Sequence, residues 1–107
     1  MQYQTSASAS DRRLEPSLSV PGLVALRDAI TVYMRGQPAD RRLRQSVRLL
    51  CDHAQRRHQR VEELLVALKD VWWSFPEVQR ASRDAGTLRT LLNRIVSMCI
   101  EQFYAND

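Results

Sequence analysis

Residues 43–75 decide the fold, and they read LRQSVRLLCDHAQRRHQRVEELLVALKDVWWSF. From Leu43 to Phe75, apolar residues recur at alternating intervals of four and three positions, and only one position of this repeat is not apolar. A mean spacing of about 3.5 residues is typical of a helix that packs lengthwise against other helices. The exception is Arg57, in the middle of the repeat. The stretch therefore predicts one long central helix over about residues 38–73, with an apolar edge.

Shorter helices are predicted on both sides of this long one. Pro21 suits the first turn of a helix, and Gly36 suits a left-handed residue that ends it. Pro76 disfavours helical geometry at the preceding residue, so it ends the long helix and opens a short one. The last helix is apolar around most of its circumference, which predicts burial on several sides. These shorter helices are expected at about residues 21–35, 75–83 and 87–104.

The chain of 107 residues suits one domain. Residues 1–20 are rich in Ser, Gln and Ala without periodicity, which predicts a disordered N-terminal tail before a single helical domain at 21–107. The expected class is all-α, a helical bundle built on the long central helix. Because one layer of short helices would cover that helix incompletely, the remaining apolar surface predicts self-association into a homodimer.

Composition narrows the class of protein. The formal net charge is +4, and arginine supplies fifteen of the sixteen basic side chains. No apolar run approaches the roughly 18 residues that span a bilayer, and the first residues do not resemble a secretory signal. We therefore expect a cytoplasmic protein without a membrane partner. Cys51 and Cys99 lack a CxxC neighbour, so we expect buried thiols rather than a disulfide or a reactive thiol.

The basic side chains gather in residues 41–60, which hold seven arginines against one acid, Asp52. On a helix, Arg41, Arg44 and Arg48 share a face outside the apolar edge. This face predicts an alternative function, nucleic-acid binding through phosphate contacts. The other interpretations are an acidic protein partner or a solvated helix face. No zinc-finger spacing, helix-turn-helix signature or interleaved aromatic residue supports base recognition.

The apolar repeat becomes polar at residues 53–58, which we call the polar waist and which contains His53, Arg57 and His58. A buried Arg57 could set the register of a dimer, and the waist could instead line a pocket for a small ligand. A third interpretation has Arg57 reaching water at a gap between helices. The two histidines are five positions apart and do not converge on one metal ion. No metal site and no cofactor are therefore predicted.

Aromatic residues supply the candidate contacts with a partner protein. Adjacent tryptophans on a helix point about 100° apart, so they cannot both fill one core layer. Tryptophan is enriched in interface hot spots, although core packing is an equally ordinary use of such side chains. The candidate partner-binding residues are Trp72, Trp73, Phe75, Phe103 and Tyr104.

The sequence carries no enzyme motif. It has no glycine-rich phosphate loop, no paired carboxylates at an evident cleft, and no recognisable arrangement of a nucleophile with a base. We therefore expect no catalytic residue and no enzyme activity. The predicted function is a non-catalytic helical protein–protein interaction module: an adaptor, a regulator or an accessory subunit. The alternatives are a nucleic-acid-binding protein and a bundle that binds a small ligand at the polar waist.

Overall fold

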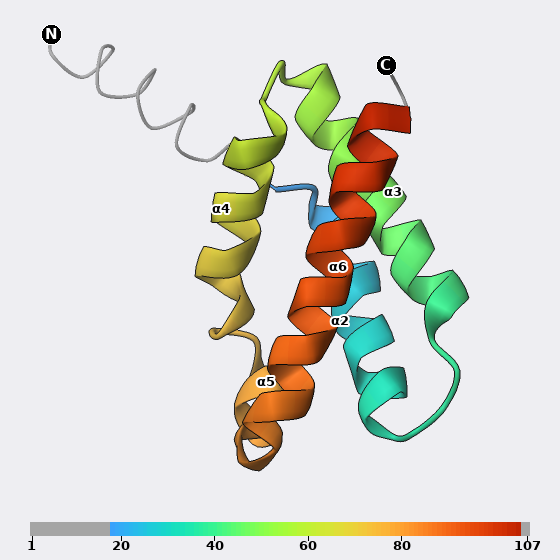
Figure 1. Ribbon diagram of the computed structural model, residues 1–107, viewed down its shortest axis with the longest axis vertical. Helices are drawn as coiled ribbons and strands as arrows, with labels where there is room; N and C mark the ends of the chain where they lie inside the picture. The colour runs from blue at the N-terminus through green and yellow to red at the C-terminus, as the bar shows by residue number, and fades with distance from the viewer. Residues whose placement is uncertain (1–17, 106–107) are drawn as a thin grey trace, which may run out of the picture.

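The computed structural model describes residues 18–105, and this part of the chain contains helices and no strand (Figure 1). The predicted all-α class is confirmed. The elements are α2 (Val20–Met34), α3 (Asp40–Arg56), α4 (Val61–Trp72), α5 (Pro76–Arg80), the 3-10 helix η1 (Ser82–Asp84) and α6 (Ala85–Ala105).

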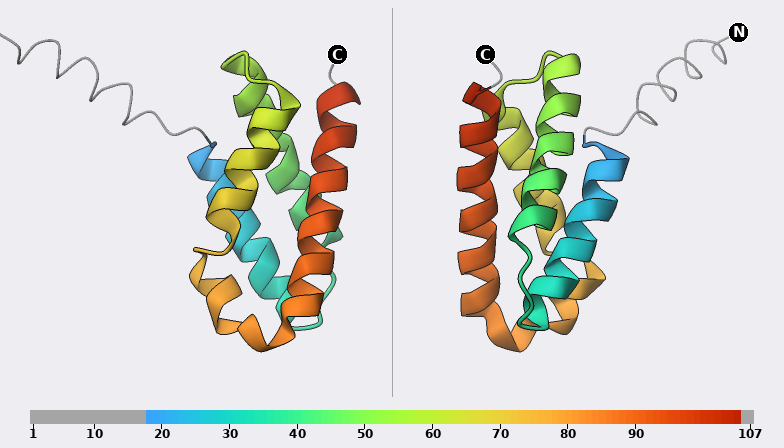
Figure 2. Two further views of the ribbon diagram at one scale, coloured as in Figure 1. Left: turned by 60° about the vertical axis from the view of Figure 1, so that its left-hand side comes forward. Right: turned by 90° about the vertical axis from the view of Figure 1, so that its right-hand side faces the viewer.

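Four of these helices form an up-and-down bundle (Figures 1 and 2). The chain descends through α2, ascends through α3, descends through α4 and ascends through α6. α2 packs mainly along α3, while α6 lies between α3 and α4 and contacts both. The short elements α5 and η1 turn the corner from α4 to α6.

The core lies where the four long helices face one another. Each helix contributes apolar side chains at helical spacing, as expected of an amphipathic helix in a bundle. The largest side chains with less than 2 % of their surface exposed are Trp72, Leu26, Ile30, Leu43, Leu50, Leu64, Leu68, Leu88, Leu91, Ile95, Val47 and Val78.

The predicted continuous helix over residues 38–73 is wrong, because the chain reverses direction between α3 and α4. His58 adopts a left-handed conformation, with φ at 58°. The N–H of His58 donates to the carbonyl of Gln55 at 3.0 Å, and the N–H of Gln59 donates to the carbonyl of Ala54 at 2.8 Å. This pair of bonds is the Schellman motif that ends many helices, here with histidine in the place that glycine usually occupies.

The next helix starts at once after this reversal. The N–H of Arg60 donates to a carboxylate oxygen of Glu63 at 2.9 Å. Glu62 and Glu63 both lie in the first turn of α4, where the helix dipole favours negative charge. The apolar repeat continues through the break, because α4 folds back and presents its apolar edge to the same core.

The core therefore closes within one chain. Trp72 is completely buried, although a straight helix would leave its side chain beside a gap. A homodimer was predicted because a continuous helix over residues 38–73 would leave apolar surface uncovered. Residues 18–105 contain no such helix, so this reason for a homodimer no longer applies. Self-association itself stays a prediction, and it needs a different physical basis.

The remaining helix ends agree with the sequence to within a few residues. α2 begins at Val20 rather than Pro21, and the Oγ of Ser19 caps it by accepting from the N–H of Gly22 at 3.0 Å. Gly36 has φ at 77°, as the left-handed cap requires. The predicted tail lies outside the described residues up to position 17. Leu18 and Ser19 are buried, so the folded part begins before residue 21.

Candidate partner-binding groove

A groove runs between α3 and α6, which lie side by side and point in the same direction (Figure 1). Its volume is about 310 Å³. The two helices contribute almost equally to its walls, with arginine on the α3 side and apolar and polar side chains on the α6 side. The lining residues are Arg44, Val47, Arg48, Met98, Glu101, Gln102 and Ala105.

Polar contacts fix the two walls at both ends of the groove. Near its upper end, the Nε2 of Gln55 on α3 donates to the carbonyl of Phe103 on α6 at 3.0 Å. Toward its lower end, the guanidinium of Arg94 on α6 pairs with the carboxylate of Asp40 on α3. Contacts at both ends hold the helices parallel, so the groove is a built feature of the bundle.

Arg41, Arg44 and Arg48 follow one exposed line along the α3 wall. With Asp40 and Gln45 they also line a second, adjoining depression on the surface. Among residues 18–105, none of these three guanidinium groups forms an ion pair. Their positive charge is therefore not neutralised within the described part of the chain.

Arg42 lies on the same helix but, unlike these three arginines, forms an ion pair. It points to the other side of α3 and pairs with Asp28 of α2 at 2.6 Å. Asp40, which lines the adjoining depression together with the three arginines, is engaged by Arg94. Within residues 18–105, the arginine that faces α2 is therefore paired, and the three along the groove form no ion pair.

The opposite wall gives the groove a mixed character. Met98 lines this wall with apolar atoms, Val47 does so from the α3 wall, and Glu101 adds one exposed carboxylate across from Arg44 and Arg48. Arginine forms bidentate hydrogen bonds with carboxylates and phosphates alike. The apolar lining favours a ligand that combines carboxylates with apolar groups over a polyphosphate backbone.

The sequence predicted the arginine side of this groove and missed the α6 side. Met98, Glu101, Gln102 and Ala105 follow the i, i+3, i+4, i+7 spacing of one helix face. This face combines apolar, acidic and amide side chains, so its spacing alone did not identify it as part of a site. Only the packing of α6 against α3 shows that this face borders the arginines.

The polar waist lies at the surface, in the turn that ends α3. His53 is half-buried in the last turn of α3, Arg57 caps that helix, and His58 is the left-handed residue after it. Arg57 is exposed, which agrees with the interpretation that it reaches water and not with a buried arginine. A depression in this region is lined by Asp52 and by two residues of the waist, Gln55 and Arg56.

The predicted partner-binding aromatics separate into two groups. Trp72 and Phe75 are buried and pack edge to face, with ring centroids 6.2 Å apart, so they belong to the core. Trp73 and Tyr104 are 47 % and 59 % exposed, and Phe103 is half-buried against Tyr104. Trp73 follows the lower end of α4 and Tyr104 lies at the upper end of α6, so they do not share one surface.

The two thiols lie between the same two helices as the groove, and both are buried. The Sγ of Cys51 donates to the carbonyl of Cys99 at 3.5 Å. The hydrogen bond with Cys51, together with burial, raises the pKa of the Cys99 thiol. Within residues 18–105, no three His, Cys, Asp or Glu side chains gather where they could hold a metal ion.

No protein family, curated protein or solved structure matches this chain. Within residues 18–105, every helix is too short or too polar to cross a lipid bilayer.

Proposed function

We propose that this chain is a non-catalytic protein–protein interaction module that binds an acidic, amphipathic segment of a partner protein in the groove between α3 and α6. One observation carries the proposal: Arg41, Arg44 and Arg48 line the groove and its adjoining depression without an ion pair inside the described chain. A partner supplies the missing carboxylates, and its apolar side chains contact Met98.

Helix-in-groove recognition is the physical mode that fits. In that mode an amphipathic helix places its apolar side chains on the groove floor and its charges on the rim. Rim charges govern orientation and association rate more than total affinity. We therefore expect an affinity that weakens with salt, and an adaptor or accessory role that needs no catalytic residue.

A titration with a labelled helical peptide tests this proposal. The peptide carries leucines along one face and glutamates on both flanks, and fluorescence anisotropy reports binding. We expect Arg44→Gln combined with Arg48→Gln to weaken binding about tenfold, because two solvent-exposed charge contacts are lost. The matched control is Arg83→Gln with Arg89→Gln, which removes the same charge from exposed positions distant from the groove.

Nucleic-acid binding is the second candidate, and the shared line of three arginines is the observation that favours it. No aromatic side chain lines either depression to stack on a base. A gel-shift experiment at low salt with single- and double-stranded oligonucleotides separates the candidates. Retardation that disappears in the Arg44→Gln, Arg48→Gln variant, together with no peptide binding, would replace the first proposal with the second.

A further inference from the structure

The outer face of α4 carries a charge pattern opposite to that of the groove. Glu62, Glu63 and Asp70 surround Val66 on this face, which we call the acidic stripe. Glu62 pairs with Arg60 at 3.2 Å, and the exposed Lys69 lies beside Val66. Val66 is 59 % exposed and Trp73, one turn beyond Asp70, is 47 % exposed. The stripe thus combines carboxylates with apolar side chains on one helix, which is the chemistry that the proposed function assigns to the partner.

The spacing of the charges also matches. Arg41 and Arg48 are seven residues apart on α3, and Glu63 and Asp70 are seven residues apart on α4. Seven residues of α-helix span about 10 Å, so the ends of the two patterns coincide when the helices lie side by side. Val66 then falls between the charged ends.

The two faces cannot meet within one molecule. α3 and α4 lie on opposite flanks of α6, and their outer faces point away from each other (Figures 1 and 2). A face that complements a different face of the same protein forms a heterologous contact, which joins copies head to tail.

We infer that a second copy of this chain is a partner for the groove, and that the acidic stripe on α4 of one copy docks between α3 and α6 of the next. This inference rests on the proposed function, because it takes the groove as a binding site for an acidic amphipathic helix. The contact leaves one free groove and one free stripe in every assembly. Its products are therefore open chains or closed rings rather than a symmetric dimer.

Sedimentation velocity of the full chain over a dilution series tests self-association. We expect the mean mass to rise with concentration at about 0.01 M salt, where charges act over about 30 Å, and to fall toward the monomer at about 1 M salt, where they act over about 3 Å. A chain that stays monomeric at low salt and at its highest soluble concentration overturns the inference.

Two variants, each altered on one face, test the head-to-tail geometry. The groove variant combines Arg44→Gln with Arg48→Gln, and the stripe variant combines Val66→Ser with Asp70→Asn. All four positions are exposed, so both variants should keep the wild-type circular dichroism spectrum and melting curve. Each variant alone should be monomeric, while an equimolar mixture should form a complex of two chains and no more. Association of either variant alone to the wild-type extent overturns the proposed contact.

The peptide titration described above, repeated on the stripe variant, separates this inference from the proposed function. Its groove is intact and cannot be occupied by another copy. Peptide binding by this variant, with a wild-type chain that stays monomeric, rejects self-association and leaves the proposed function standing. Loss of peptide binding together with a monomeric wild type rejects both.

Discussion

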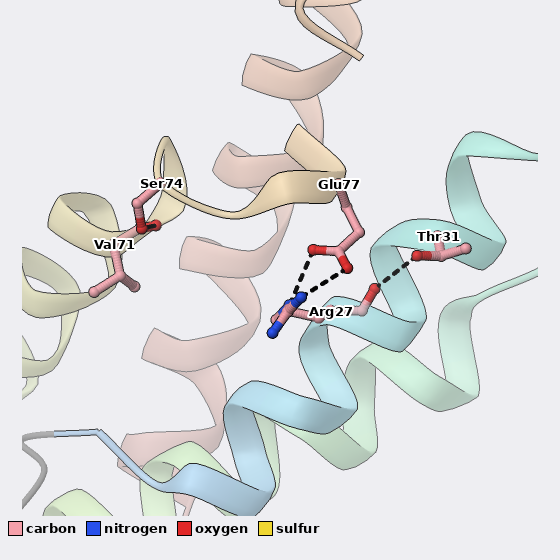
Figure 3. A network of polar contacts seen from close by, with 5 residues as sticks. All are labelled: Arg27, Thr31, Val71, Ser74 and Glu77. Carbon is pink, nitrogen blue, oxygen red and sulfur yellow. Dashed lines mark hydrogen bonds and ion pairs between the residues drawn. The ribbon is translucent and has the colours of Figure 1, made fainter. Parts of the chain in front are cut away.

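Arg27 on α2 and Glu77 on α5 form a bidentate ion pair between residues 50 positions apart in the sequence (Figure 3). The Nε of Arg27 lies 3.0 Å from Oε1 of Glu77, and its Nη2 lies 3.1 Å from Oε2. The pair fixes the corner between α4 and α6 to the first helix. Arginine–carboxylate pairs with two parallel bonds are the geometrically specific kind.

This ion pair predicts a pH-dependent contribution to stability. The hydrogen bond from Arg27 lowers the pKa of Glu77 below its ordinary value of 4.5. The contribution is therefore complete above 4.5 and is lost as the pH falls through the lowered value. We expect Glu77→Gln to reduce the free energy of unfolding at neutral pH, and the difference from wild type to shrink in acid. Urea unfolding at a series of pH values measures it.

Glu101→Gln is the matched control, because Glu101 forms no ion pair among the described residues. Its effect on stability should be smaller than that of Glu77→Gln at neutral pH. Equal losses for both variants would show that the α2–α5 pair contributes nothing of its own.

Two glycines predict opposite responses to the same substitution. A Cβ on Gly22 would lie 3.0 Å from two side-chain atoms of Leu50 and 3.2 Å from its backbone nitrogen. Gly22→Ala should therefore force α2 and α3 apart and cost about 1–3 kcal/mol. A Cβ on Gly86 would meet nothing within 4 Å, so Gly86→Ala in α6 should stabilise by up to about 1 kcal/mol. Urea unfolding of both variants compares them, and a neutral Gly22→Ala would mean that α2 and α3 pack less closely.

The turn between α3 and α4 predicts a further stabilising substitution. A residue other than glycine destabilises the folded state by roughly 1–2 kcal/mol when it adopts the left-handed conformation. Glycine avoids most of this cost, but its greater backbone freedom in the unfolded chain offsets part of the gain. His58→Gly should therefore raise the free energy of unfolding by up to about 1 kcal/mol. His58→Val should lower it, because a β-branched side chain fits this conformation poorly. Thermal melts of the pair measure the difference, and a tolerated valine would contradict the left-handed turn.

The same turn shows why the sequence predicted most helix ends and missed one. Gly36 and His58 occupy equivalent positions in two Schellman motifs, since the residue after each also bonds back to a carbonyl five positions earlier. The glycine was recognisable because few other residues favour positive φ. Histidine carries no comparable signal, and the apolar repeat continues unbroken across the reversal. Only the carboxylates of Glu62 and Glu63 marked a new helix start.

The site was predictable to a smaller extent than the fold. The α3 side of the groove follows from helical spacing, because Arg41, Arg44 and Arg48 repeat at three and four positions. The α6 side depends on which helix packs beside α3, and that depends on the missed reversal. A straight rod would have placed α6 against the second half of the rod, away from the arginines. Because the turn at His58 was not predicted, the α6 side of the groove was not predicted either.

The corner after α4 shows a smaller difference of the same kind. Ser74-Phe75-Pro76-Glu77 reads as a capping box, in which Ser74 would cap the helix that follows. The Oγ of Ser74 instead donates to the carbonyl of Val71 at 2.6 Å, in the helix that precedes it (Figure 3). Glu77 is then available to Arg27, a long-range partner that local sequence does not specify.

The rate at which a thiol reagent labels the buried cysteines should report how often the two walls of the groove separate. Cys51 and Cys99 lie between α3 and α6, so a thiol reagent reaches them only when these helices separate or the chain unfolds. Labelling should be slow in the native protein and fast in urea. The raised pKa of the Cys99 thiol adds to the protection of Cys99 alone, because the thiolate is the reactive form and the hydrogen bond with Cys99 lowers the pKa of the Cys51 thiol.

An acidic amphipathic peptide bound between α3 and α6 joins the two walls and opposes their separation. We therefore expect the peptide to slow native-state labelling of wild type, and to have little effect on the Arg44→Gln, Arg48→Gln variant. Mass spectrometry of the labelled chain follows both thiols at once. If the peptide binds tightly and the labelling rate does not change, it occupies a surface other than the groove, since no ligand can bridge these walls without restraining their opening.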